Sequence, residues 1–220
     1  MKVVKVKKQM LYQEQVECQS KKVESQIRMN GIMGLFFAPE YLKDDDKFVL
    51  DSVMQNGLAL QYASNRLKHN TLIVSTAVKE NGYALQYVPD KYRYDYHLHL
   101  LAVKVNGLSL RYASEEICDD HYIIYEAVKQ NGLALQYASE KLKNDKVIVS
   151  TAIKENGLAL QYASENLCNN REIVLEAVRK NSNALKYASL YYYTDPECLS
   201  IVMNNIYFRG NIEKLKPMWA

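Results

Sequence analysis

The sequence reads NGLALQYASEKLKNDKVIVSTAIKEN from Asn131 to Asn156, and close copies of this stretch recur along most of the chain. The Asn-Gly pair that opens each copy falls every 25 residues, at positions 56, 81, 106, 131 and 156. A sixth, degenerate copy begins at Asn181-Ser182, and Asn30-Gly31 precedes the first by one unit with a single insertion. Self-similarity at a fixed period of this size is the signature of proteins built from stacked units.

Each repeat is predicted to contain two short helices. Apolar residues occur in adjacent pairs four apart, as in Ile148 and Val149 followed by Ala152 and Ile153, which makes one apolar stripe on a helix. Asp or Asn, the preferred N-cap residues, stand just before that helix in every unit: Asn70, Asp95, Asp120, Asp145, Asn170 and Asp195. The helix is expected to end at Asn-Gly, with the glycine in the left-handed conformation that closes a helix C-terminus.

These patterns predict an all-α protein, a right-handed α-solenoid of about seven 25-residue helix–turn–helix repeats. A helix of six to ten residues is not stable alone in water, so each unit must bury its stripe against its neighbours. Residues 30–205 are expected to form the repeat array, with an N-terminal capping segment at 1–29 and a C-terminal cap at 206–220.

The composition is that of a folded protein, with 48% hydrophobic and 24% charged residues. A net charge of +3 argues against a protein whose main task is to coat nucleic acid. No apolar run is long enough for a membrane-spanning helix, and the N-terminus has no signal peptide pattern. The four cysteines form no close pair and are expected to be reduced thiols. We therefore expect a cytoplasmic protein, in the host cytosol if a phage or effector gene encodes it.

Two rows of regular positions suggest RNA binding. A tyrosine that recurs in every unit could stack one base per repeat: Tyr62, Tyr87, Tyr112, Tyr137, Tyr162 and Tyr187. A basic ladder in the last turn of the second helix could follow a phosphate backbone: Lys79, Lys104, Lys129, Lys154 and Arg179. Folding explains both rows more simply, because an unchanging tyrosine can pack between units and cations favour a helix C-terminus.

Departures from the repeat are the preferred candidates for function, because solenoids vary at their binding edges and tyrosine and arginine are enriched in binding hot spots. The predicted partner-binding residues are Tyr92, Arg93, Tyr94, Tyr96, His97, Tyr122, Tyr191, Tyr192 and Tyr193. The next repeat adds His121 and Tyr125 to the same stretch, just after its inter-helix turn. The competing interpretation is that some of these rings replace core leucines, as Tyr92 clearly could.

Enzyme and metal chemistry find no support in the sequence. His97 and His99 are two apart on a predicted helix and point in different directions, and Cys118 and Cys168 lie two units apart. Glycine-rich phosphate loops, nucleophile elbows and acid–base pairs with a supporting residue are all missing. No catalytic residue, metal site, cofactor or small-molecule substrate is therefore predicted.

The unit NGLALQYASEKLKNDKVIVSTAIKENG resembles the domain-of-unknown-function family numbered 4116, whose short helical repeats carry the same NG-LALQYAS pattern. The resemblance covers about residues 30–205 and departs at Val88-Pro89, at residues 181–183 and in the tyrosine-rich turns. The family assigns no catalytic residues. Its members resemble bacterial, intracellular-parasite effector and phage proteins, some of them linked to inhibition of CRISPR immunity.

The sequence therefore predicts a non-enzymatic helical-repeat protein that binds and inhibits or recruits a protein or ribonucleoprotein partner. The resemblance implies a specific version, an anti-CRISPR inhibitor of an effector complex. The alternative is an RNA-binding repeat protein that uses the basic ladder and the repeated tyrosines. No membrane partner is expected.

Overall fold

The computed structural model describes residues 32–208, whose regular elements are all helices, with no strand among them. The chain divides into two compact units, Met1–Tyr92 and Arg93–Ala220. The predicted N-terminal cap at 1–29 and most of the predicted C-terminal cap lie outside the described residues. Each unit is an array of helical repeats, as the sequence predicts.

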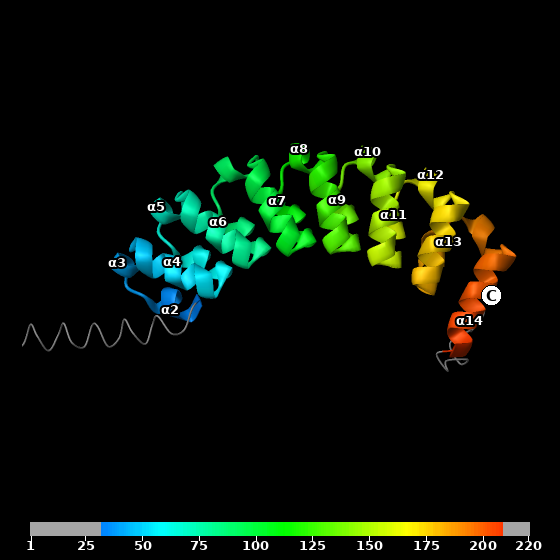
Figure 1. The fold of residues 1–220 in the computed structure, drawn as a ribbon, viewed down its shortest axis with the longest axis horizontal. Coiled ribbons are helices and arrows are strands. Elements are labelled where there is room, and N and C mark those ends of the chain that lie inside the picture. The colour runs from blue at the N-terminus through cyan, green and yellow to red at the C-terminus, as the bar shows by residue number, and fades with distance from the viewer. Residues whose placement is uncertain (1–31, 209–220) are drawn as a thin grey trace, which may run out of the picture. The chain divides into compact units, whose positions relative to one another are not determined.

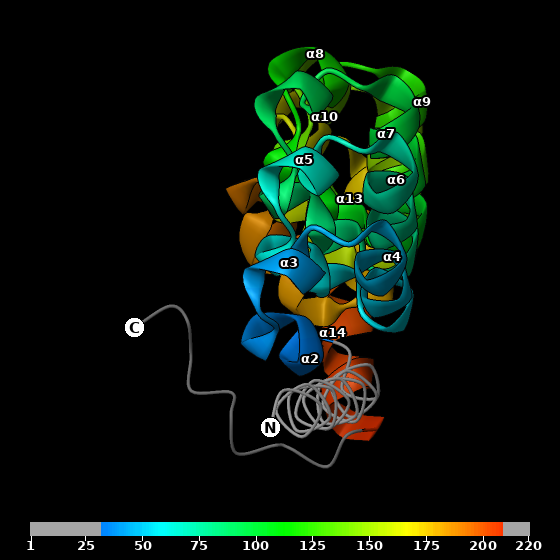
Figure 2. The same ribbon diagram turned by 90° about the vertical axis from the view of Figure 1, so that its left-hand side faces the viewer.

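The described part of the first unit contains three α-helices of six to ten residues, which shorter helical segments join. Its elements are α2 (Ile32–Phe37), α3 (Glu40–Lys43), α4 (Asp46–Gln55), η1 (Gly57–Tyr62), α5 (Asn65–Lys68), α6 (Thr71–Glu80), η2 (Gly82–Tyr87) and η3 (Asp90–Tyr92), where η denotes a 3₁₀ helix. The long helices α4 and α6 contact each other, and so do η1 and η2. Figure 2 shows the short helices α3 and α5 in one layer and α4 and α6 in another.

The second unit repeats the same arrangement more often. Its elements are α7 (Tyr96–Val105), η4 (Gly107–Tyr112), α8 (Glu115–Cys118), α9 (His121–Gln130), η5 (Gly132–Tyr137), α10 (Glu140–Lys143), α11 (Lys146–Glu155), η6 (Gly157–Tyr162), α12 (Glu165–Cys168), α13 (Arg171–Lys180), η7 (Ser182–Tyr187), η8 (Leu190–Tyr193) and α14 (Pro196–Phe208). The long helices α7, α9, α11, α13 and α14 lie side by side in chain order (Figure 1). Packing between successive repeats therefore builds the unit.

Each repeat contains three helical segments, where the sequence analysis expected two. The GLALQY segment is a six-residue 3₁₀ helix, and a four-residue α-helix separates it from the long helix. Side chains cap all three segments in the repeat that begins at Asn131. The Asn131 Oδ1 accepts a bond from the Leu133 N–H at 3.0 Å, and Ser139 Oγ accepts one from the Leu142 N–H. Capping at each start explains how such short helices persist.

The predicted N-caps of the long helices are confirmed. The Asp145 carboxylate accepts bonds from the N–H groups of Val147 at 2.8 Å and Ile148 at 3.0 Å. The other five predicted side chains accept comparable bonds: Asn70, Asp95, Asp120, Asn170 and Asp195. The apolar stripe is also confirmed, because the residues at the third, fourth, seventh and eighth positions of the ten-residue helices are buried.

The role predicted for the repeated glycine is wrong. The helix ends with the asparagine in an extended conformation, and the glycine starts the next 3₁₀ helix without a left-handed backbone. Its constraint is spatial. A Cβ on Gly132 would lie 2.2 Å from the carbonyl oxygen of Ala152, which belongs to the following repeat. Glycine is needed because η5 packs its backbone directly against the backbone of α11.

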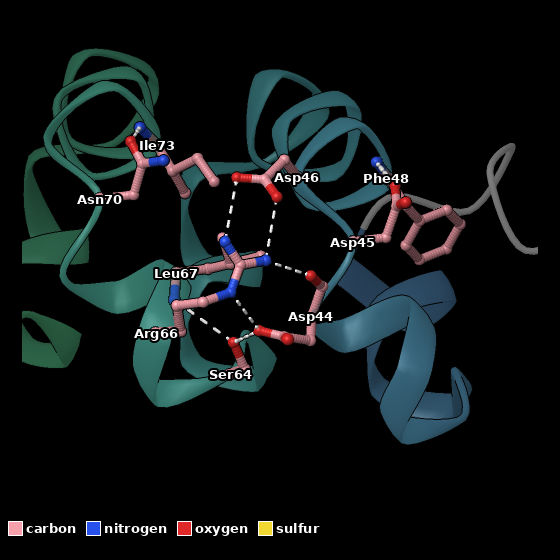
Figure 3. A network of polar contacts seen from close by, with 9 residues as sticks. All are labelled: Asp44, Asp45, Asp46, Phe48, Ser64, Arg66, Leu67, Asn70 and Ile73. Carbon is pink, nitrogen blue, oxygen red and sulfur yellow. Dashed lines mark hydrogen bonds and ion pairs between the residues drawn. The ribbon is translucent and has the colours of Figure 1, made fainter.

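Side chains also connect the short helices of successive repeats. In the first unit, Arg66 binds both oxygens of Asp46, at 2.9 and 3.4 Å, and the carboxylate of Asp44 at 3.0 Å (Figure 3). The Ser64 hydroxyl donates to the same Asp44 carboxylate, and this bond, followed by that of Arg66, lowers the pKa of Asp44 below its ordinary value. In the second unit, Ser139 bonds to Asp119 in the same way, at 2.5 Å. These links fix the position of each repeat on the one before it.

Candidate partner-binding surface

Aromatic side chains gather on the outer surface of two neighbouring helices of the second unit. The first, second, fifth and sixth positions of each long helix face away from the buried stripe. On α7 and α9 these eight positions hold Leu101, Glu126 and the six residues that we call the aromatic face: Tyr96, His97, Leu100, His121, Tyr122 and Tyr125. Because α7 and α9 pack against each other, both helices contribute to one surface.

The aromatic face combines packed and exposed rings. Tyr96, Leu100 and Tyr125 are partly buried and pack against the hydrophobic core, whereas Tyr122 is 48% exposed. The rings of Tyr96 and His97 meet edge to face with their centroids 5.6 Å apart. Burial raises the pKa of Tyr96, and the nearby Asp120 and Tyr122 raise it further. Tyr96 of α7 and Tyr122 of α9 therefore lie near enough to interact electrostatically.

The same outer positions on α11 and α13 hold paired charges. Lys146 lies 2.5 Å from Glu172 of the next helix, and Ser150 donates to Glu176 at 2.7 Å. Arg171 and Arg179 both bind Glu197 of α14, at 2.7 and 2.5 Å. These polar and charged side chains therefore pair with one another across neighbouring helices. Val147, 60% exposed, extends the apolar surface onto the edge of α11.

Two of the predicted partner-binding tyrosines belong to the core. Tyr92 is 5% exposed and donates its hydroxyl to the carbonyl oxygen of His69 at 3.0 Å. Tyr192 is 4% exposed and donates to the carbonyl oxygen of Asn169 at 2.7 Å. Both occupy the register of Leu67 in the repeat, and each bonds to the turn of the preceding repeat. A binding role for these two side chains is therefore corrected to a structural one.

The other predicted residues are not brought together at one place. Tyr94 and Arg93 are exposed in the turn before α7, with Tyr94 at 66%. Tyr191 is 70% exposed on η8, where Tyr193 packs partly against the core. Because η8 packs on α14, these tyrosines lie at the opposite end of the second unit from α7 (Figure 1). Tyr96, His97 and Tyr122 form the cluster, and sequence reasoning missed Leu100, where other repeats have Ser75 or Ser150.

The basic ladder is largely engaged within the protein. Lys129 lies 3.8 Å from Glu126, Lys154 lies 3.9 Å from Glu176, and Arg179 binds Glu197. Lys104 is exposed at the end of α7, and Lys79 is exposed in the first unit. A phosphate backbone would have to compete with these carboxylates in the second unit.

The repeated tyrosines and the polar residues beside them also serve the fold. Tyr137, Tyr162 and Tyr187 are partly buried against the core. The neighbouring glutamines donate to the carbonyl oxygen three residues back in their own 3₁₀ helices, as Gln136 does to Leu133 at 3.0 Å. Lys186 instead lies over the ring of Tyr187, 4.7 Å from its centroid. These side chains are occupied locally, which disfavours a base-reading code.

Thiols and histidines within the described part of the chain form no metal-binding group of three or more ligands. Burial raises the pKa of the Cys198 thiol to about 11, so this thiol stays protonated at neutral pH. His99 is 1% exposed in α7, at the register where other repeats have valine or isoleucine. Among residues 32–208, no helix has the length and apolar character to cross a bilayer.

Stacked three-segment helical units thus define a helical-repeat protein. The family described as "Domain of unknown function (DUF4116)" matches the chain four times, at residues 27–68, 71–118, 120–160 and 148–192. The chain belongs to this family. A comparison with curated proteins and one with solved structures found no match.

Proposed function

We propose that this protein is a non-enzymatic helical-repeat protein that binds a protein partner through the aromatic face of α7 and α9. The observation that carries the proposal is the pair Tyr96 and Tyr122, held on adjacent helices at positions where α11 and α13 hold paired charges. Partly exposed tyrosines contribute large contact areas at small entropic cost, because each has few side-chain torsions to immobilise.

The scaffold supports such a role because it holds the rings in place before binding. Tyr96 and Tyr125 pack against the core of the unit, and their helices begin at side-chain caps. A preorganised surface loses less conformational entropy on association than a mobile loop. Inhibition or recruitment of the partner would then follow from occupying its surface. An effector complex of CRISPR immunity is the partner of this class that the family resemblance suggests testing first.

RNA binding is the weaker candidate. It needs free cations along the repeats, and three of the five ladder residues lie within ion-pair distance of carboxylates. It also needs polar side chains free to read bases, and the glutamines beside the repeated tyrosines are bonded to backbone. RNA affinity would fall steeply with salt, since counterion release dominates it.

Affinity purification from the cell that encodes the protein tests the proposal. A variant with Tyr96→Ala and Tyr122→Ala is expected to retain about tenfold less partner protein, because each truncation removes a hot-spot ring. Tyr191→Ala, which removes an exposed tyrosine at the other end of the unit, is the control and is expected to retain the partner normally.

Circular dichroism melts must confirm that all three proteins are equally folded at the temperature of the experiment. If the double variant retained the partner normally and Tyr191→Ala lost it, the binding surface would lie at η8 and not on the aromatic face. The alternative function would be favoured if the unsubstituted protein retained RNA, and if this RNA were lost at high salt and in a Lys129→Glu, Lys154→Glu variant.

A further inference from the structure

The short helix α2 exposes apolar side chains in the first unit. Met33, Phe36 and Phe37 are 51%, 45% and 68% exposed, and the two phenylalanine rings meet edge to face with their centroids 4.6 Å apart. Counted back from the alanine that follows each helix, the same places in η1 hold three side chains that are all partly buried: Leu58, Gln61 and Tyr62. The surface of α2 is therefore more apolar and more exposed than that of the next repeat.

The 3₁₀ helices within the array pack on elements from both sides. The helix η5, for example, contacts α9 and η4, which precede it, and α11 and η6, which follow it. The helix α2 holds the same place in its repeat, and within residues 32–208 it packs on α4 and η1, which both follow it. By the rule of the array, a long helix that ends just before α2 belongs beside it, as α9 lies beside η5.

The residues just before α2 match a long helix in length and connection. Asn30 stands 26 residues before Asn56, the residue that caps the end of α4, so residues 20–29 correspond to α4. In the regular repeats an Asn-Gly pair joins the long helix to the 3₁₀ helix without a linker, and Asn30-Gly31 holds this place before α2. Such a short tether gives the segment a high effective concentration at α2 compared with any separate molecule.

The side chains of residues 20–29 include an apolar pair and a polar pair at the positions of the stripe. Val23 and Ile27 take the fourth and eighth positions, where α4 buries two valines completely. Lys22 and Gln26 take the third and seventh positions. In other long helices the seventh position lies against the preceding repeat, because its carbonyl oxygen meets the repeated glycine there. The apolar pair thus suits packing on the following repeat, and the polar pair suits the outer side of a terminal helix.

We propose that residues 20–29 form the first long helix of the array and dock on α2 and α4 through Val23 and Ile27. The register of this segment and the apolar surface of α2 support the contact, since residues 20–29 lie outside the described part of the chain. Burial of the two aliphatic side chains and of apolar surface on α2 stabilises the docked state. The contact lies in the first unit and does not depend on the aromatic face.

Photo-cross-linking of the purified full chain tests the contact directly. A photoreactive phenylalanine analogue at position 27 is expected to form an intramolecular adduct with peptides of α2 or α4, which mass spectrometry identifies after proteolysis. The matched control is position 26, the next residue but on the polar side of the helix. It is expected to give several-fold less of the same adduct.

Urea unfolding followed by circular dichroism gives a second, independent readout. A variant with Val23→Ala and Ile27→Ala is expected to lower the urea midpoint by about 1 M, because it truncates two buried aliphatic side chains. A variant with Lys22→Ala and Gln26→Ala changes the same segment at its polar positions. Its midpoint is expected to move by less than about 0.2 M.

The proposal would be overturned if position 27 gave no adduct with α2 or α4, or if positions 26 and 27 gave equal adducts. Adducts between two chains, seen as a dimer on a denaturing gel, would make a second copy the occupant of α2 and contradict docking within the chain. An unchanged midpoint for Val23→Ala, Ile27→Ala would also count against it, and so would an equal loss in the Lys22→Ala, Gln26→Ala control.

Discussion

Replacement of Gly132 by alanine is expected to destabilise the second unit by about 3 kcal/mol, the upper end of the usual cost of overpacking. The added Cβ would lie 2.2 Å from the Ala152 carbonyl oxygen and 3.0 Å from the Asn156 nitrogen. Both are backbone atoms of the following repeat, so no side-chain rotation relieves the contact. The repeats must separate, which weakens the packing of η5 on α11.

Urea unfolding followed by circular dichroism measures this effect as a shift of the midpoint. The matched control is Ser182→Ala, because that repeat already carries a Cβ at the glycine position and has Val202 where the others have alanine. Its free energy of unfolding is expected to change by less than about 0.5 kcal/mol. An unchanged midpoint for Gly132→Ala would show that the close backbone contact does not constrain the repeat.

Tyr192→Ala is expected to cost about 3 kcal/mol or more, because it removes a buried aromatic ring and leaves a cavity. The hydroxyl bond to the Asn169 carbonyl oxygen is lost as well. Tyr192→Phe keeps the ring and is expected to cost about 1 kcal/mol, the usual net value of one hydrogen bond. The measurement is again the free energy of unfolding.

Substitution of the neighbouring Tyr191 is the control for this prediction, because its side chain is exposed and not part of the core. Tyr191 is 70% exposed, so Tyr191→Ala is expected to change stability by less than about 0.5 kcal/mol. If Tyr192→Ala melted like the unsubstituted protein, its burial would not matter to the fold, and Tyr192 would return to the set of candidate contact residues.

Local pattern was sufficient to predict the repeat, the apolar stripe and the caps. An N-cap such as Asp145 acts on N–H groups two and three residues away, so its role is visible in a short stretch of sequence. The glycine was misread because its constraint lies twenty residues away, at the backbone of Ala152. The 3₁₀ form of LALQYA was missed for a related reason, since six-residue helices of either type share much of their pattern.

The candidate site could be predicted only in part. Irregular repeats pointed to Tyr96, His97 and Tyr122, which the structure gathers on one surface. Tyr92 and Tyr192 belong to the leucine register and could have been assigned to the core by alignment of the repeats alone.

If the regular positions build the array and the aromatic face of α7 and α9 binds the partner, then position 122 must lie against the partner in the cell. Photo-cross-linking tests this, with a photoreactive phenylalanine analogue at position 122 and, as the matched control, at position 172. Both are second positions of exposed helices, on α9 and α13. We expect one defined protein adduct from position 122 in the encoding cell and little from 172. Equal adducts from both positions, or adducts from 172 alone, would contradict the claim.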